Sequence, residues 1–287
     1  MLMSFLAAQY HHRFTVDPVR AAPAIASLMA LGVALAIGRY TARPRLAAGA
    51  TAFLQMTFFT LFGVVLAYAL AANSGRLWDA RLAAADRAIG FNWPVVLALL
   101  DKCPPAVWLL GLAYHSLTLQ MVVIIVALSG MEKFDTLRTM VCAAILSGFV
   151  TILISGLTPA RGNLFDPSHY GHLWPSIAWS EQGLISGLRD GSLRVLDLTM
   201  LMGIVSFPSF HATLAAIFIW AFGAMPRVAL PGRAWAILTI VATPVFGGHY
   251  GVDVIIGLFL APPAIVAARH LTRSKQPSHS IVSVLPA

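Results

Sequence analysis

The chain has 287 residues, of which 59% are hydrophobic and only 10% are charged, and its mean hydropathy is +0.80. Soluble domains carry roughly a quarter charged residues, so this composition excludes a soluble globular protein and predicts an integral membrane protein. The formal net charge of +8 does not indicate nucleic-acid binding, because the basic residues are scattered between apolar runs.

The two chain ends carry few functional signals. The N-terminal stretch MLMSFLAAQYHHRF is too short for a cleavable signal and lacks a basic start, so we expect none. Residues 276–287 are predicted to form a disordered tail. Cys103 and Cys142 fall near opposite ends of different apolar runs, which argues against a disulfide. We therefore expect residues 1–287 to form a single integral membrane domain.

The apolar runs predict an all-α, polytopic bundle. A membrane span needs about 20 apolar residues, and about seven runs qualify: residues 21–38, 46–72, 105–129, 137–157, 207–224, 233–247 and 250–268. The last two are continuous, and a single helix of that length would far exceed the roughly 30 Å hydrocarbon core. The segment FGGHYG is therefore predicted to form a turn at a membrane surface.

Basic residues predict how the bundle is oriented. They crowd the short connections and the C-terminal segment, namely Arg39, Arg43, Arg45, Lys133, Arg138, Arg227, Arg233, Arg269, Arg273 and Lys275. With seven spans these positions all fall on one side, which the positive-inside rule makes the cytoplasmic side. We expect an inner-membrane protein whose longer polar segments lie on the non-cytoplasmic face.

The segment GRLWDARLAAADRAIGF follows the second run. At helical spacing it places Trp78, Leu82, Ala85 and Ile89 on one face, with its charged residues elsewhere: Asp79, Arg81, Asp86 and Arg87. This pattern predicts an amphipathic helix lying in the membrane interface.

Residues 158–205 form the most polar segment of the chain. His169 and His172 have a spacing that suits a metal, but no further ligand signature accompanies them, so ordinary loop histidines are favoured. Trp174 and Trp179 are most simply interfacial anchors. Likewise, His115, inside an apolar run, is predicted to form a helix–helix hydrogen bond.

Two short motifs carry the chemistry. In GGHYGVD, Asp253 follows His249 by one helical turn, so its carboxylate can fix the tautomer of the imidazole and leave one nitrogen as a nucleophile. In SFPSFHAT, His211 can supply a proton to a departing oxygen. Pro208 is predicted to lie in the first helical turn, where free backbone N–H groups form an anion site.

Two arginines of the polar segment, Arg161 and Arg189, can add positive charge to this site, although a local turn or salt bridge is favoured for Arg189. Two histidines, a carboxylate and an anion site fit phosphoryl transfer through a phosphohistidine.

The motifs FPSFHAT and GGHYGVDVIIG resemble the second and third signature motifs of the type 2 phosphatidic acid phosphatase superfamily. The resemblance covers residues 75–268, and the most similar branch holds bacterial homologues of inositol phosphorylceramide synthase. It implies that His249 is the nucleophile, Asp253 its orienting partner and His211 the general acid. It also implies that Ser209 helps to hold the phosphate and that no metal or other cofactor is needed.

Three departures from the family pattern bear on the reaction. Phe210 stands where the glycine before the motif-two histidine is usual, Thr243 where phosphatases carry an arginine, and the first motif is reduced to TPARGN. These departures favour a transferase over a plain phosphatase. The substrate is then a lipid phosphate or a phospholipid, and the acceptor is water or an alcohol such as inositol, with the loop of His169, Trp174 and Trp179 as a lid.

A transporter or proton-coupled channel is the alternative function. In that case His115 and Asp253 would be relay residues in the membrane. Transporters commonly show repeated halves with broken helices near the midplane, whereas this sequence shows no repeat and gathers its polar residues at one surface. The enzyme is therefore favoured.

Overall fold

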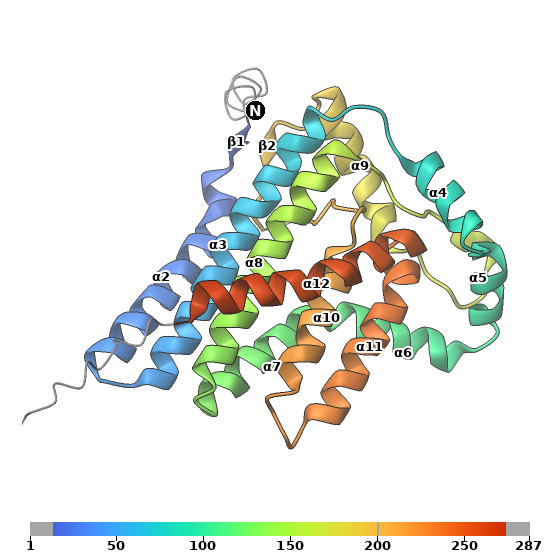
Figure 1. Cartoon of the computed structure of the whole chain (residues 1–287). Coiled ribbons are helices and arrows are strands. Elements are labelled where there is room, and N and C mark those ends of the chain that lie inside the picture. The colour runs from blue at the N-terminus through green and yellow to red at the C-terminus, as the bar shows by residue number, and fades with distance from the viewer. Residues whose placement is uncertain (1–13, 200, 274–287) are drawn as a thin grey trace, which may run out of the picture.

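The computed structural model describes residues 14–199 and 201–273, and this part of the chain is mostly helical. The predicted disordered tail and nearly all of the N-terminal stretch lie outside the described residues. The longer helices pack together into one bundle, and shorter elements lie over one end of it (Figure 1).

Five helices are long and apolar enough to cross a membrane: α2 (Pro18–Tyr40), α3 (Pro44–Ala72), α8 (Phe134–Leu157), α11 (Ala229–Phe246) and α12 (Gly251–Thr272). Two pairs also qualify if each is taken as one bent span: α4 (Asp79–Ala88) with α5 (Trp93–Asp101), bent by 79°, and α6 (Pro104–His115) with α7 (Leu117–Gly130), bent by 54°. The all-α, polytopic architecture predicted from the sequence is confirmed.

Helix α10 (Phe210–Phe222) is shorter than the predicted span at 207–224. Its 13 residues give a length of about 20 Å. The helix begins late because Ser209 is its N-cap and accepts a hydrogen bond from the backbone N–H of Ala212 at 3.3 Å. The prediction that Pro208 lies in the first helical turn is therefore wrong, since Pro208 precedes the cap.

The short basic connections gather at one end of the bundle. Figure 1 shows the α2–α3, α7–α8 and α10–α11 connections at its lower end. Arg45 Nε lies 2.9 Å from Glu132 Oε1 and so links the first two of them. Figure 1 shows α9 (Ile177–Asp190) at the opposite end, together with the parallel bridge between β1 (Thr15–Val16) and β2 (Val195–Leu196). The 3-10 turn η1 (Pro167–His169) precedes α9 in the chain.

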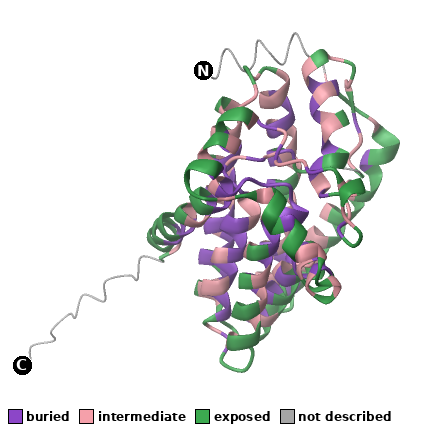
Figure 2. Ribbon diagram, turned by 90° about the vertical axis from the view of Figure 1, so that its right-hand side faces the viewer, coloured by how far each residue is buried: buried purple, intermediate pink, exposed green. Residues whose placement is uncertain are grey.

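The bundle is apolar on its outside as well as inside. Buried residues line the interior, where α3, α7, α8, α10 and α12 share one hydrophobic cluster (Figure 2). Large apolar side chains also point outward, such as Phe62, 61% exposed, and Phe259, 72% exposed. Soluble monomers rarely expose apolar surface on this scale, whereas lipid chains solvate it at no cost.

Helices α10 and α12 touch through their backbones. A Cβ atom at Gly257 would lie 2.4 Å from the carbonyl oxygen of Ser209, so no larger residue fits without displacing one helix. The hydroxyl of Thr213 donates to the carbonyl oxygen of Gly257 at 2.8 Å. This close approach fixes the start of α10 against the start of α12, and thereby brings the two sequence motifs together.

Helix α4 forms where the interfacial helix was predicted, but its faces differ from the prediction. Leu82 is buried as expected, whereas Asp86, assigned to the polar face, is fully buried and Ile89 is 53% exposed. Leu82 and Asp86 are four residues apart and so share a face, which packs against the bundle. A charged residue tolerates this position because three donors meet its carboxylate.

Candidate active site

The Gly-Gly-His turn, Gly247–Tyr250, connects α11 to α12 and places His249 beside Asp253. The Nδ1 atom of His249 lies 3.5 Å from Oδ2 of Asp253, and both side chains are almost wholly buried. This separation is long for a charge-assisted hydrogen bond, and neither His249 Nδ1 nor Asp253 Oδ1 has a hydrogen-bond partner within the described residues. Such contacts commonly tighten when a substrate binds.

The carboxylate of Asp253 is held in place by two other donors. Its Oδ2 atom accepts from the backbone N–H of Tyr250 at 2.9 Å and from the hydroxyl of Ser206 at 3.1 Å. The first of these bonds belongs to a capping box at the start of α12. Asp253 is thus oriented toward Nδ1 of His249, which favours the tautomer with a free lone pair on Nε2.

His211 lies in the first turn of α10 and faces the same place. Its ring is 6.2 Å from the ring of His249, measured between centroids. It stacks on Tyr114 of α6, with centroids 4.8 Å apart and planes 16° apart. The structure therefore brings His211, His249 and Asp253 together, and the stacking holds the His211 ring in one orientation.

Ser209 is fully buried at the start of α10. Its hydroxyl caps the helix, and its backbone N–H donates to the carbonyl oxygen of Asp253 at 3.0 Å. Ser209 thus links the two motifs through the backbone, in addition to the part predicted for it in phosphate binding.

Arg161 lies in the loop that follows α8, and this loop packs directly on the Gly-Gly-His turn. Gly162 adopts a φ of +104°, and a Cβ there would lie 2.3 Å from the carbonyl oxygen of Gly248, so the loop needs glycine. Asn163 N–H donates to that same carbonyl at 2.6 Å. The side chain of Arg161 is half-buried next to the turn, and its Nε atom has no partner among the described residues.

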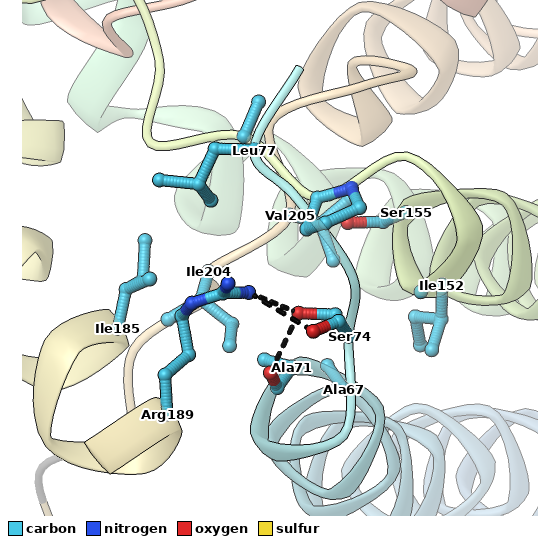
Figure 3. Close-up of a pocket in the computed structure, with 13 residues that line it drawn as sticks. Ala67, Ala71, Ser74, Leu77, Ile152, Ser155, Ile185, Arg189, Ile204 and Val205 are labelled. Atoms are coloured by element: carbon cyan, nitrogen blue, oxygen red, sulfur yellow. Dashed lines mark hydrogen bonds between the residues drawn. The ribbon is translucent and has the colours of Figure 1, made fainter. Parts of the chain in front are cut away.

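Arg189 is placed differently from Arg161. Its guanidinium donates to the hydroxyl of Ser74 and to the carbonyl oxygen of Gly75, in a small pocket between α3, α8 and α9 (Figure 3). Ile204 and Val205, which lead into the second motif, line the same pocket. Arg189 thus fastens the end of α9 to the α3–α4 connection in this structure, rather than joining the histidines.

Two carboxylates of α4 hold the site from outside, and the sequence interpretation missed both. Asp79 accepts from the backbone N–H groups of Arg161 and Gly162, at 3.0 Å each, and lies 3.2 Å from the hydroxyl of Tyr250. It therefore ties the Arg161 loop to the Gly-Gly-His turn.

Asp86 performs the corresponding role at the start of α12. It accepts from the N–H groups of Gly251 and Val252, at 2.8 Å each, and from Nε1 of Trp93 at 2.6 Å. A carboxylate at a helix N-terminus is stabilised by the helix dipole. The spacing of seven residues, which puts Asp79 and Asp86 on one face, was the available sequence signal.

The family departures Phe210 and Thr243 both point into the protein. The hydroxyl of Thr243 donates to the carbonyl oxygen of Thr239 at 2.7 Å, and the residue is fully buried within α11. The ring of Phe210 packs against Phe59 of α3, with centroids 5.8 Å apart. Neither position contributes a polar group to the histidines.

The outer loop packs over the same region. Trp174 lies against Trp108 and Phe246, with centroids 5.1 Å and 4.8 Å away. Trp179 is 39% exposed and donates through Nε1 to the carbonyl oxygen of Phe165 at 2.8 Å, whereas His169 is exposed. Trp174 is thus the member of the predicted lid that packs on the end of α11.

Two further histidines in the described part of the chain, His115 and His172, do not join the group of His211, His249 and Asp253. His172 Nδ1 lies 3.0 Å from the carbonyl oxygen of Asp101, and His115 is exposed at the bend between α6 and α7. Within residues 14–199 and 201–273, no group of three or more His, Cys, Asp or Glu side chains is arranged to hold a metal ion.

Comparison with known proteins agrees with this geometry. A family model described as the PAP2 superfamily matches residues 80–267. The matched range begins in α4 and ends in α12, so it includes both motifs and the Arg161 loop, whereas α2 and α3 lie outside it. No curated protein and no solved structure matches the chain.

Proposed function

The chain belongs to the PAP2 superfamily, which supports a phosphatase-type phosphoryl-transfer function, and from this premise we propose that it acts on phospholipids through a phosphohistidine at His249. The observation that carries the proposal is the fixed pair of His249 and Asp253, with His211 across from it at 6.2 Å. An oriented imidazole with a second imidazole opposite is what in-line displacement at phosphorus requires.

In the first half-reaction, Nε2 of His249 attacks the phosphorus atom of the lipid. A P–N bond forms as the P–O bond to the diacylglycerol oxygen breaks, and His211 gives its proton to that oxygen. Asp253 stabilises the positive charge that develops on the His249 ring. The products are free diacylglycerol and a phosphorylated His249.

In the second half-reaction, a hydroxyl group attacks the same phosphorus atom. His211, now neutral, takes the proton of that hydroxyl as the P–O bond forms and the P–N bond breaks. Water as the acceptor yields a free phosphate compound, and an alcohol yields a new phosphodiester. His249 and His211 are then back in their starting states.

The charges near the site favour a phosphodiester donor. A phosphomonoester dianion needs several cations, since each charge-assisted hydrogen bond contributes about 1.5–3 kcal/mol. Arg161 is half-buried beside the turn, and its Nε atom has no hydrogen-bond partner in residues 14–199 and 201–273, while Arg189 donates to Ser74 and Gly75. Ser209 and the start of α10 complete the phosphate site in this proposal. An alcohol such as inositol is the preferred acceptor.

The site is proposed to face the non-cytoplasmic side of the inner membrane. This placement is supported by the basic connections, which lie at the other end of the bundle from α9. A cysteine introduced at Ser180 should react with an impermeant reagent added outside intact cells, and one at Pro231 should not. Labelling of both from the outside would overturn this orientation.

The transporter alternative is not supported by the surroundings of Asp253. Its carboxylate is occupied by Tyr250 N–H and Ser206 Oγ and lies against His249, which suits an orienting group better than a proton relay.

A lipid panel tests the proposed function. Purified protein in mixed micelles is incubated with phosphatidic acid, or with a phosphodiester lipid, in the presence and absence of inositol. Released diacylglycerol, free phosphate and new phosphodiesters are measured together. We expect diacylglycerol release that depends on His249 and new phosphodiester in excess of hydrolysis. Rapid phosphate release from phosphatidic acid alone, unaffected by any alcohol, would establish a plain lipid phosphatase instead.

A further inference from the structure

Glu181 is a buried carboxylate that the chemistry above does not use. Helix α9 turns one face toward the bundle, and the residues of this face are Ala178, Glu181, Ile185 and Leu188, which are 2%, 8%, 5% and 0% exposed. Their spacing of three and four residues is that of a single helix face. The other three members are apolar, so the face would bury well with an apolar residue at 181 as well.

The neighbours of Glu181 along this face place it beside the catalytic histidines. Ala178, one turn earlier, contacts the Gly-Gly-His turn: a Cβ at Gly248 would lie 2.5 Å from the Ala178 Cβ. Ile185, one turn later, lines the pocket that also contains Ile204 and Val205 (Figure 3). Glu181 therefore lies between the nucleophile and an apolar pocket that leads from the second motif.

The carboxylate of Glu181 also lies within electrostatic reach of two tyrosines, Tyr68 on α3 and Tyr114 on α6. Tyr114 is the ring on which His211 stacks. Glu181 thus approaches the general acid from the side of α9.

In the part of the chain that the structure describes, no hydrogen bond or ion pair holds this carboxylate. The side chain is only 8% exposed, and this burial disfavours the ionised form and raises the pKa of Glu181 to about 8. Apolar residues occupy the rest of the face at no such cost. A ligand that donates a hydrogen bond to the carboxylate would offset the cost of ionising it.

We propose that Glu181 binds the headgroup of the phospholipid donor and selects a headgroup that donates hydrogen bonds, through hydroxyl or ammonium groups. This inference rests on the proposed function. When a donor from the ligand ionises it, the Glu181 carboxylate repels a bare phosphomonoester, and acyl chains offer it no donor. The group attached to the far side of the phosphate is therefore the part of the lipid that it can bind.

A hydrogen bond from the headgroup to Glu181 would act in both half-reactions. When diacylglycerol leaves, the headgroup stays on the phosphorus atom of the His249 adduct. A residue that holds the headgroup therefore keeps the adduct oriented until the acceptor arrives. Glu181 is then a specificity residue that acts on donor binding and on transfer alike.

A matched series of donors tests the inference. Phosphatidylethanolamine carries an ammonium group, phosphatidylglycerol carries hydroxyl groups, and phosphatidylmethanol carries neither, while all three are phosphodiesters. Diacylglycerol release is measured for the wild type, Glu181→Gln and Glu181→Ala. We expect kcat/KM for the preferred donor to fall roughly 10- to 100-fold in both variants, which is the fold-change expected for loss of one hydrogen bond to a charged group. For phosphatidylmethanol the change should stay within about twofold.

The two variants distinguish the two headgroup chemistries. A glutamine still accepts a hydrogen bond from a hydroxyl, so Glu181→Gln should be milder than Glu181→Ala if the donor is phosphatidylglycerol. A glutamine forms no ion pair with an ammonium group and offers it only a neutral acceptor, so the loss in Glu181→Gln should lie closer to that of Glu181→Ala if the donor is phosphatidylethanolamine.

Glu132→Gln is the matched control, because it removes one carboxylate at the opposite end of the bundle and should leave all three donors unaffected. Equal loss for all three donors in Glu181→Gln, or no loss for any, would show that Glu181 does not read the headgroup. Wild-type protein that releases diacylglycerol only from phosphatidic acid would also overturn the inference while leaving phosphoryl transfer intact. If the wild type released it from no lipid, the proposed function itself would fail.

Discussion

Two side-chain pairs in different regions of this protein differ in opposite ways in their separation and in their burial. Arg20 and Asp197 join the start of α2 to the segment after β2, with Nη1 and Oδ2 2.6 Å apart and side chains that are 59% and 21% exposed. His249 and Asp253 are separated by 3.5 Å, but their side chains are 5% and 0% exposed. Water screens the shorter pair, while burial removes that screening from the longer one.

The surroundings of the two pairs differ in the same way. Helix α2 buries only Ala21 and Gly38, and exposed apolar side chains such as Met29 cover its outer face. Around the Gly-Gly-His turn, by contrast, Asp79, Asp86 and Asp253 each accept hydrogen bonds from backbone N–H groups. Helix α2 can lie at the periphery because lipid covers its apolar surface. The conformation of the Gly-Gly-His turn depends instead on individual hydrogen bonds. Four predictions test this contrast, and the expected effect decreases from the first to the last.

The largest effect is expected at the proposed nucleophile. His249→Ala should abolish turnover and the phosphorylated enzyme, because it removes the imidazole that lies against Asp253. His211→Ala should slow turnover but still allow an adduct when the leaving group is good, since such a group needs no proton. Labelling with a radioactive phosphodiester followed by an acid and base stability test checks this, because phosphohistidine is acid-labile and base-stable. Wild-type activity in His249→Ala would refute the mechanism.

Asp86→Asn should come next, although Asp86 touches no substrate. Loss of the charge weakens the bonds from Gly251 and Val252, and the new amide group faces those donors, so the free energy of unfolding should fall by about 3 kcal/mol. Turnover should fall as well, because these bonds hold the start of α12. Thermal unfolding in detergent and diacylglycerol release measure the two effects. Arg87→Gln, on the exposed side of α4, is the control and should change neither.

Glu181→Gln should show a pH-dependent gain in stability in the absence of lipid. Burial raises the pKa of Glu181 to about 8, while in the unfolded chain this side chain ionises near its ordinary pKa of 4.5. The wild type therefore loses stability as the pH rises from 4.5 to about 8. The glutamine has no such term. The difference in unfolding midpoint between variant and wild type should therefore widen over this window and level off above it. A difference that is constant with pH would show that Glu181 is not buried as described.

The smallest effect is expected at the peripheral ion pair. Arg20→Ala removes the contact with Asp197, and we expect less than about a twofold change in activity, because exposed pairs contribute little. Activity at low and at high salt checks this, with salt weakening any residual effect. A loss as large as that of Asp86→Asn would mean that α2 is coupled to the site, contrary to the contrast between the two regions.

The helical architecture and the two motifs could be predicted from the amino-acid sequence alone. Apolar runs are long-range signals that need no knowledge of contacts, so the predicted spans correspond to helices, although one is bent at His115 and another begins only at Phe210. The four-residue spacing of His249 and Asp253 is a local property of a helix start and was equally readable. The tertiary structure places His211 beside this pair, as the motifs led us to expect.

The polar residues that hold these motifs in place could not be predicted, because they follow from how the helices pack. Asp79 and Asp86 look like the solvated side of an interfacial helix, because a sequence pattern cannot say which face of a short helix meets the bundle. In the sequence Glu181 is one of several charges in a polar segment, whereas in the structure it lies on the buried face of α9. The sequence left more than one role possible for Arg189, and in the structure it donates to Ser74 and Gly75. The physical reason is the same in each case. A hydrogen bond between residues 82 or 165 positions apart depends on how the helices pack. The local periodicity of a sequence does not predict that packing.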